Sequence, residues 1–221
     1  MSDRKPIILC PLEFERKVLQ RQLSGTGLRV VCCGPGKEGV TRWAGLNRAP
    51  GAPVVLAGLV GSLVEELNAG DVVDLEAAVA PGNLRIETNW HLAESCRVPR
   101  VTGTSSTRLV NSRPARRALN LHLGCSIVDM ESLAFARAAR ELDWTFGMVR
   151  GISDGLDETL PPGCDQWVDH RGRPARGAIA ASILRTPSLV GRMRIMKRTG
   201  EKVLETLANH LKATLETKVD R

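Results

Sequence analysis

The sequence has no tyrosine, and aromatic residues make up only 3% of its 221 positions. Nucleic-acid-binding proteins usually carry a recognisable motif or aromatic side chains interleaved with basic ones, so this shortage argues against that class despite a net charge of +7. The chain also lacks an apolar run long enough to span a bilayer, and its first residues show no cleavable signal peptide. We therefore expect a globular, cytoplasmic protein with a solvated basic surface.

Metal-ligand and disulfide patterns are missing as well. The six cysteines contain no Cys-x-x-Cys pair, and the four histidines are scattered without ligand spacing. Most of the cysteines lie in or beside apolar runs, which favours reduced thiols in the core over a disulfide framework or a zinc site. We expect neither a metal nor a cofactor.

Short apolar runs alternate with segments of helical periodicity along the chain. This alternation predicts an α/β fold with a mainly parallel sheet, and the length of the chain favours one domain over residues 1–221. Residues 81–112 are less regular, and we expect one or two edge strands and a loop there. The expected strands cover residues 6–11, 28–33, 53–60, 71–80 and 146–152, and the expected helices 12–23, 36–46, 114–123, 133–142, 177–184 and 189–215.

Two carboxylates frame the segment 128–157. Met130-Glu131 stands at the start of a predicted helix, and Ser153-Asp154 follows an apolar run at its carboxyl end, where open α/β sheets bind ligands. This arrangement resembles the signature of the nucleoside phosphorylase and nucleosidase superfamily, which cleaves N-ribosidic bonds. The resemblance implies a central mixed β-sheet flanked by helices, and a homo-oligomer, dimer or hexamer, in which a neighbouring subunit often closes the site.

The resemblance also assigns roles to these four residues. Asp154 would protonate the leaving purine, with Ser153 supporting it, and burial at a strand end can raise a carboxyl pKa as this role requires. Glu131 would accept hydrogen bonds from two ribose hydroxyls, while Met130 packs against the sugar. The alternatives are a helix N-cap for Ser153 and Asp154, and an ordinary first-turn acid for Glu131. The spacing of the two elements, one helix plus one strand, favours the catalytic interpretation.

A third acid follows the first predicted strand. In the nucleosidase branch one of the acids here activates the attacking water, and Glu15 matches that position best, with Glu13 as the alternative. Phosphorylases commonly bind phosphate in this region with Gly and Arg. An acid repels phosphate, which favours hydrolysis, although Arg16 is adjacent.

Two further segments are rich in glycine, and the first of them suggests close backbone approach to a ligand. Gly58 and Gly61 match the Gly-rich element of the superfamily, but Leu59 stands where many members have Ser or Thr, which leaves room for a degenerate site. Residues 34–39 spell Gly-x-Gly-x-x-Gly, yet the following strand ends without the acid that a dinucleotide site needs, so we predict a simple strand-to-helix turn. The resemblance places nucleobase contacts near residues 108–110.

The C-terminal segment, about residues 186–217, is amphipathic and basic. The structural interpretation is a terminal helix packed on the domain. The functional alternative is a surface helix that makes weak contact with an anionic membrane. A basic tail of this kind is loosely similar to the hopanoid-associated phosphorylase branch of the superfamily.

Three functions follow from these features. We expect hydrolysis of a purine nucleoside, similar to methylthioadenosine/adenosylhomocysteine nucleosidases. The enzymatic alternative is phosphorolysis of an adenosyl-lipid or a purine nucleoside, with phosphate as a second substrate. The third alternative is a nucleoside-binding relic of the fold without catalysis.

Overall fold

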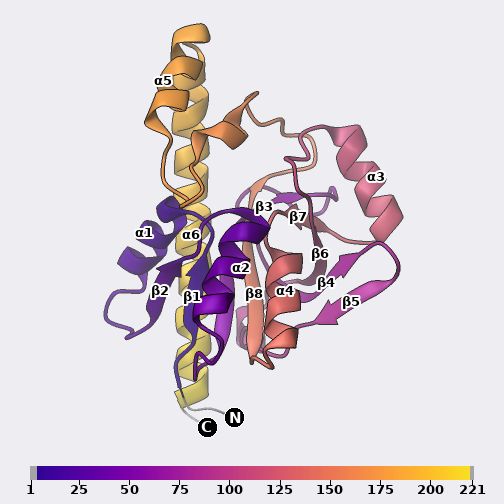
Figure 1. Ribbon diagram of the computed structural model, residues 1–221, viewed down its shortest axis with the longest axis vertical. Helices are drawn as coiled ribbons and strands as arrows, with labels where there is room; N and C mark the ends of the chain where they lie inside the picture. Colours follow the sequence, from indigo (N-terminus) through magenta and orange to yellow (C-terminus); the bar gives the residue numbers. More distant parts are fainter. Residues whose placement is uncertain (1–3, 220–221) are drawn as a thin grey trace.

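The computed structural model describes residues 4–219 of the chain and shows strands and helices alternating as predicted (Figure 1). The strands are β1 (Ile7–Cys10), β2 (Arg29–Cys32), β3 (Val54–Ser62), β4 (Val72–Ala80), β5 (Leu84–Glu87), β6 (Arg100–Ser105), β7 (Ile127–Asp129) and β8 (Phe146–Asp154). The helices are α1 (Glu13–Gln22), α2 (Gly36–Leu46), α3 (Arg113–Leu123), α4 (Ser132–Glu141), α5 (Arg176–Arg185) and α6 (Leu189–Val219), with short 3₁₀ turns η1 (Glu94–Cys96) and η2 (Cys164–Trp167).

The strands form one mixed sheet, part of which closes on itself. β3 pairs with β7 and β8, β4 pairs with β6 and β8, and β6 pairs with β7, so these five strands make a small barrel. β1 and β2 extend the sheet from β3, and β5 extends it from β4. Most pairs are parallel, and the predicted α/β fold with a central mixed sheet flanked by helices is confirmed.

One expectation for residues 81–112 was wrong. β5 lies at an edge, as predicted, but β6 is an interior strand between β4 and β7. Its sequence carries few large apolar residues, and a Cβ on Gly103 would lie only 2.6 Å from Ile127 and 2.7 Å from Leu75. Large side chains of the neighbouring strands therefore fill the space over Gly103, and the residue at this position must be small.

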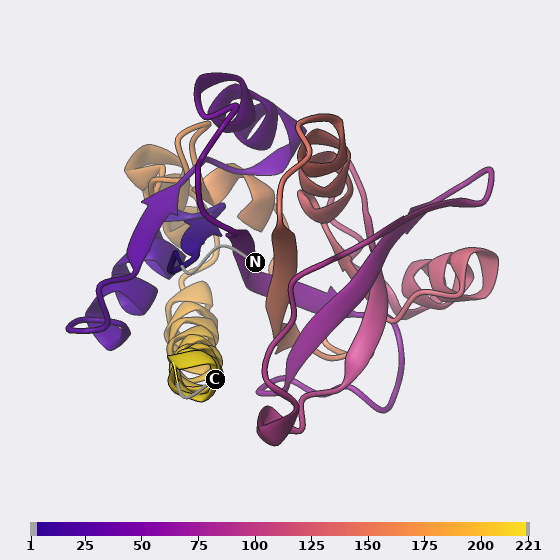
Figure 2. The ribbon, with the colours of Figure 1, turned by 90° about the horizontal axis from the view of Figure 1, so that it is seen from below.

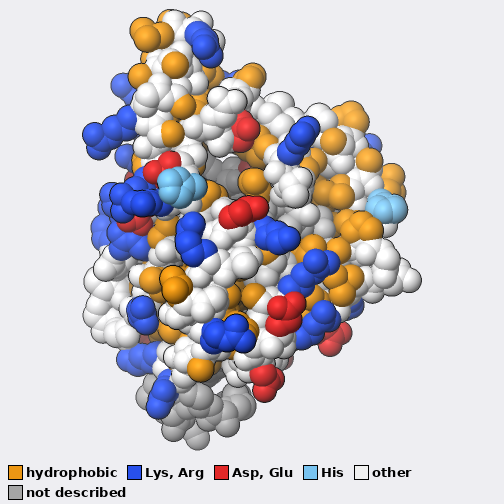
Figure 3. Space-filling view, viewed as in Figure 1, with side chains coloured by type: hydrophobic (Ala, Val, Ile, Leu, Met, Phe, Trp, Pro, Cys, Tyr) orange, Lys and Arg blue, Asp and Glu red, His pale blue; other side chains and the backbone are white. Residues whose placement is uncertain are grey.

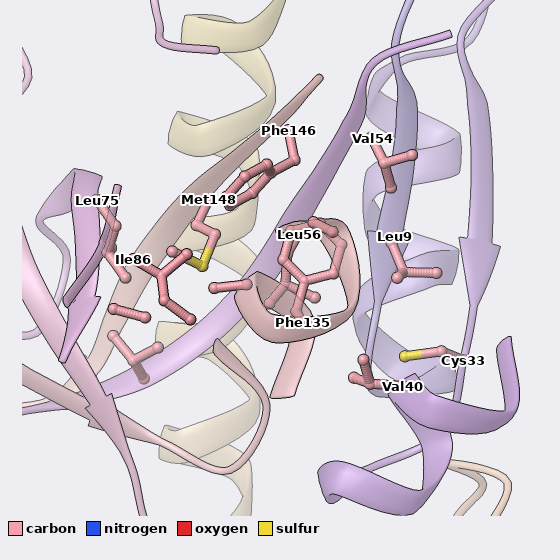
Figure 4. Close-up of a cluster of buried hydrophobic side chains, with 14 of the residues drawn as sticks. Leu9, Cys33, Val40, Val54, Leu56, Leu75, Ile86, Phe135, Phe146 and Met148 are labelled. Carbon is pink, nitrogen blue, oxygen red and sulfur yellow. The ribbon is translucent and has the colours of Figure 1, made fainter. Parts of the chain in front are cut away.

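Helices cover the sheet on two sides (Figures 1 and 2). On one side α2 and α4 enclose a cluster in which Phe135 packs with Trp144 and Phe146, close to Leu56 and Met148 (Figure 4). On the other side, α1 and the C-terminal half of α6 pack on a second apolar cluster. The buried side chains that α1 and α6 contribute to it are Val18, Leu19, Leu204, Leu207, Ala208 and Leu211.

The parallel pairing of β1, β3 and β8 brings their carboxyl ends to one edge of the sheet. In the register of β3 and β8, Gly58 lies opposite Arg150 and Gly61 lies opposite Asp154. The glycine-rich end of β3 and the acidic end of β8 therefore meet. Within residues 4–219, no helix is long and apolar enough to cross a membrane.

Candidate active site

Glu15 enters the protein interior from the first turn of α1. Its two carboxylate oxygens accept hydrogen bonds from the backbone N–H groups of Leu59 (2.8 Å) and Leu12 (2.9 Å). Burial raises the pKa of Glu15 to about 7, and these two bonds and the positive charge of Arg150 only partly offset that rise. Glu13, the alternative acid, instead pairs with Arg16 near the surface. The geometry therefore places Glu15, and not Glu13, among the buried groups.

Glu131 reaches the same region from the residue just before α4. Its Oε1 accepts a hydrogen bond from the backbone N–H of Gly36 (2.7 Å), the first residue of α2. Burial, reinforced by the nearby charge of Asp129, raises the pKa of Glu131 to about 7. Its neighbour Met130 is half-buried.

The Gly36 N–H group that donates to Glu131 belongs to the glycine-rich turn at residues 34–39. Gly34 and Gly36 adopt positive φ angles of 90° and 71°, which side chains other than glycine rarely tolerate. The turn connects β2 to α2, as predicted for a strand-to-helix turn, and it presents the N-terminus of α2 to a carboxylate, a position that the helix dipole favours.

Arg150 supplies the positive charge of this cluster. It lies on β8 and is completely buried, forming ion pairs with Asp129 and, at 3.5 Å, with Glu131. Asp129 also caps α4 by accepting from the Ser132 backbone N–H (3.0 Å). The Nε and Nη1 groups of Arg150 are buried and have no hydrogen-bond partner within the described residues.

Asp154 ends β8 on the other side of Gly61. It forms a buried ion pair with Arg116 of α3, and the Ser153 hydroxyl lies beside its other oxygen. Burial raises the pKa of Asp154, while the Arg116 charge and the Ser153 hydroxyl oppose the rise. Arg116 is fixed in turn by the backbone carbonyl of Val110 (3.0 Å).

Gly58 and Gly61 leave space for the two outer acids. A Cβ on Gly58 would lie 2.8 Å from the Glu15 carboxylate, and one on Gly61 would lie 2.9 Å from that of Asp154. Both glycines are therefore required for these carboxylates to approach the β3 backbone. Along β3, the Cα atoms of these two glycines, three residues apart, lie about 10 Å from each other.

Leu59, between these glycines, contributes only its backbone to the cluster. Its N–H donates to Glu15, while its side chain packs towards Gly200 of α6, whose Cβ would lie 3.1 Å from it. The site thus lacks a hydroxyl at this position but keeps the backbone donor.

The space beside Asp154 is small. A cavity of about 50 Å³ is lined by Asp154, Arg116 and Met130, by residues 108–110, and by Leu160. Ligand pockets of enzymes usually measure about 300–1,000 Å³. The cavity as it stands is smaller than this range, and residues 108–110 and Leu160 form part of its wall. Residues 108–110, expected near the nucleobase, do border the acid.

Sequence reasoning missed two functional candidates, Arg116 and Arg150. A charged residue inside the apolar run of β8 is a signal that could have revealed Arg150. Arg116 has no such signal, because Arg113 and Arg117 on the same helix are exposed and look identical in sequence. No group of three or more His, Cys, Asp or Glu in residues 4–219 is placed to hold a metal ion.

Comparison with known proteins supports the fold. The family model described as the phosphorylase superfamily matches residues 91–185, which include Glu131 and Asp154. A search of curated proteins found no match.

Several solved structures are similar over nearly the whole chain. A 5′-methylthioadenosine/S-adenosylhomocysteine nucleosidase from Helicobacter pylori is 17% identical, with a TM-score of 0.69 over 97% of this chain and 98% of that one. The corresponding nucleosidase from Neisseria meningitidis is 18% identical, with a TM-score of 0.67 over 97% and 100%. A futalosine hydrolase mutant from Helicobacter pylori is 17% identical, with a TM-score of 0.66 over 97% and 99%. The predicted resemblance is confirmed: this chain has the fold of the nucleoside phosphorylase and nucleosidase superfamily, and its sequence matches that superfamily over residues 91–185.

Proposed function

We propose that this chain hydrolyses the N-ribosidic bond of a purine nucleoside. The observation that carries the proposal is the placement of two buried acids with raised pKa values, Glu15 and Asp154, over glycines at either end of one short stretch of β3. A ribose placed between them would have the general acid, Asp154, on the side of its nucleobase. It would have the general base, Glu15, on the side of the attacking water.

Each carboxylate fits one step of the reaction. Cleavage leaves a cationic sugar and an anionic base, so the departing purine needs a proton, which Asp154 would donate. Glu131 would accept hydrogen bonds from the ribose hydroxyls. Glu15, with a pKa of about 7, is partly ionised near neutrality and would take the proton of the attacking water. The unpartnered N–H groups of Arg150 could orient that water.

Arg116 bears on the acid step. Its charge lowers the pKa of Asp154 in the closed arrangement. A nucleobase that separated the two groups would remove this effect, raise the pKa of Asp154 and favour its protonated form. We therefore propose that entry of the substrate raises the pKa of Asp154 and so leaves this residue protonated and able to donate.

The charge of the cluster favours water over phosphate as the nucleophile. Glu15, Asp129 and Glu131 surround the single cation Arg150, so the cluster carries surplus negative charge whenever at least two acids are ionised. Phosphorolysis stays the second candidate, because the two free donors of Arg150 suit an oxyanion as well as a water molecule.

Product analysis separates these functions. The chain is incubated with methylthioadenosine, adenosylhomocysteine, adenosine or inosine, each with and without phosphate. Hydrolysis predicts free base and free ribose sugar without phosphate, whereas strict phosphate dependence with a ribose-1-phosphate product would establish phosphorolysis instead. Asp154→Asn and Glu15→Gln should each lower kcat about 10²- to 10⁴-fold while nucleoside binding, measured by calorimetry, persists.

Glu13→Gln is the matched control for Glu15→Gln, because Glu13 lies on the same helical turn but faces Arg16 near the surface. It should leave kcat unchanged. Binding of a nucleoside with no turnover in either condition would support the relic, and unchanged turnover in Asp154→Asn would rule out Asp154 as the acid.

A further inference from the structure

Helix α5 and the first half of α6 project beyond the rest of the molecule at its upper end in Figure 1. We call residues 176–202 the α5–α6 projection. Every residue of α5 is described, and none is buried. Along α6 up to residue 202, only Leu189 and Gly200 are buried. A helix of a globular protein normally buries one face, so this projection has surface available for a partner.

The projection carries nearly all of the net charge of the chain. It contains seven Lys or Arg residues and one acidic residue, Glu201, and so accounts for six of the seven net positive charges. All seven cations are exposed. The rest of the chain has a net charge of +1, with 24 basic and 23 acidic residues. The seven are Arg176, Arg185, Arg192, Arg194, Lys197, Arg198 and Lys202.

Large apolar side chains are exposed among these cations. Leu184 is 83% exposed and adjoins Arg185, and Ile195 is 66% exposed and adjoins Arg194. Orange and blue side chains accordingly lie together at the upper end of the space-filling view (Figure 3). Cations beside exposed aliphatic side chains are the combination that lets a helix bind in the interfacial region of a bilayer.

We propose that the α5–α6 projection docks this protein on an anionic membrane surface. Charge complementarity supplies the attraction, since each Lys or Arg near an anionic leaflet strengthens binding about fivefold. The aliphatic residues favour a lipid surface over nucleic acid, because binding of single strands relies on aromatic stacking, and the projection has no aromatic residue. A second copy of the chain is a poor partner for this surface, because two projections would repel each other.

Docking would also place the candidate active site near the lipid surface. Arg192 of the projection donates to the carbonyl of Thr159 (2.6 Å), the neighbour of Leu160, which lines the cavity beside Asp154. The projection therefore contacts a residue directly next to the wall of this cavity. The docking proposal does not depend on which reaction the site performs.

Flotation of the full chain with lipid vesicles tests the proposal. Vesicles of equal parts phosphatidylglycerol and phosphatidylcholine should carry the protein upward, and pure phosphatidylcholine vesicles should not. Binding should be lost in about 1 M salt, where the Debye length falls to about 3 Å. Changing Arg185, Arg194 and Arg198 together to Gln should weaken binding on the order of 100-fold. Leu184→Ser with Ile195→Ser should weaken it at unchanged charge.

Two matched controls separate the projection from general effects of charge and hydrophobicity. Gln at Arg48, Arg137 and Arg140 removes the same charge from exposed sites on other elements, and should weaken binding far less. Ser at Leu46 and Leu121, which are 82% and 85% exposed elsewhere, should leave binding unchanged. Thermal unfolding followed by circular dichroism verifies that each variant is folded.

Three outcomes would overturn the proposal. The first is failure to float with anionic vesicles, or equal loss of binding in the charge variant and its control. The second is tight, salt-sensitive binding to duplex DNA or RNA without vesicle binding. The third is a self-associated species, seen by analytical ultracentrifugation, that Leu184→Ser with Ile195→Ser dissociates, again without vesicle binding.

Discussion

Arg150 provides the positive charge on which the buried acids Asp129 and Glu131 depend. Arg150→Met should lower the free energy of unfolding at pH 7 by about 3–5 kcal/mol, because it leaves buried carboxylates without their counter-charge. The deficit should shrink at pH 5, where those acids can take up protons. Urea unfolding at both pH values measures it. Arg137→Met, at an exposed position, should change stability by no more than about 0.5 kcal/mol.

Glu15 makes a separate contribution to the pH dependence of stability. Its pKa rises from 4.5 to about 7 in the folded protein, so between these values the folded state holds more protons than the unfolded state. The contribution is therefore complete below pH 4.5 and is lost as the pH rises through 7. Glu15→Gln should make the fall in unfolding free energy from pH 5 to 7 shallower by at most about 1.4 kcal/mol per pH unit.

Chemical denaturation at several pH values measures this slope. Glu13→Gln should not produce the same flattening, because its pairing with Arg16 lowers the pKa of Glu13 instead. An unchanged slope in Glu15→Gln would mean that Glu15 titrates normally.

The acids of the candidate site could be predicted from sequence, and the apolar run around Arg150 offered a signal for that cation, but Arg116 could not be predicted. Asp154 ends β8 and Glu131 follows β7, and both strands pair with the carboxyl-terminal end of β3, although β7 runs antiparallel to it. Arg116 reaches Asp154 from a helix 38 residues earlier, and nothing local distinguishes it from exposed arginines beside it. The charge beside Asp154 thus depends on a long side chain from a distant helix. The residues next to Arg116 in sequence do not indicate its contact with Asp154.

At the scale of elements, the turn before α2 depends on a close backbone contact. A Cβ on Gly39 would lie 2.2 Å from the carbonyl oxygen of Gly34, so Gly39→Ala should destabilise the protein by about 1–3 kcal/mol. Gly45→Ala lies in the same helix with open space around it and should instead stabilise by about 0.5–1 kcal/mol. Thermal unfolding of the two variants should give shifts of opposite sign, and equal shifts would contradict the contact.

The helices and most strands could be predicted because each carries its own periodicity or apolar run. β6 shows the limit of that reasoning: its interior place depends on pairing with β4 and β7, which are distant in sequence. A short strand of small and polar residues is typical of an edge when considered alone. In this barrel, large side chains of the neighbouring strands supply the packing around β6. A run of small and polar residues therefore does not indicate an edge strand here.

At the scale of the whole molecule, the six free cysteines report on global folding. Cys10, Cys33 and Cys125 are buried, and burial raises their thiol pKa values. Iodoacetamide should therefore modify at most the three half-buried thiols of the native protein, and all six after unfolding. Peptide mass spectrometry measures both states. Native modification of Cys125 as fast as Cys164 would contradict the packing around α3.

The hydrogen bond between Glu131 and Gly36 joins residues 95 positions apart, and Arg42 reaches the carbonyl of His170 across 128. Contacts between residues so far apart in sequence raise the contact order. A high contact order slows folding, because closing a long loop costs conformational entropy before the stabilising contact forms. During synthesis, the N-terminal half carries Glu15 and the α2 turn long before Asp154 leaves the ribosome. The acids can therefore assemble only after β8 has been made, and a chain interrupted before β8 would lack both Arg150 and Asp154.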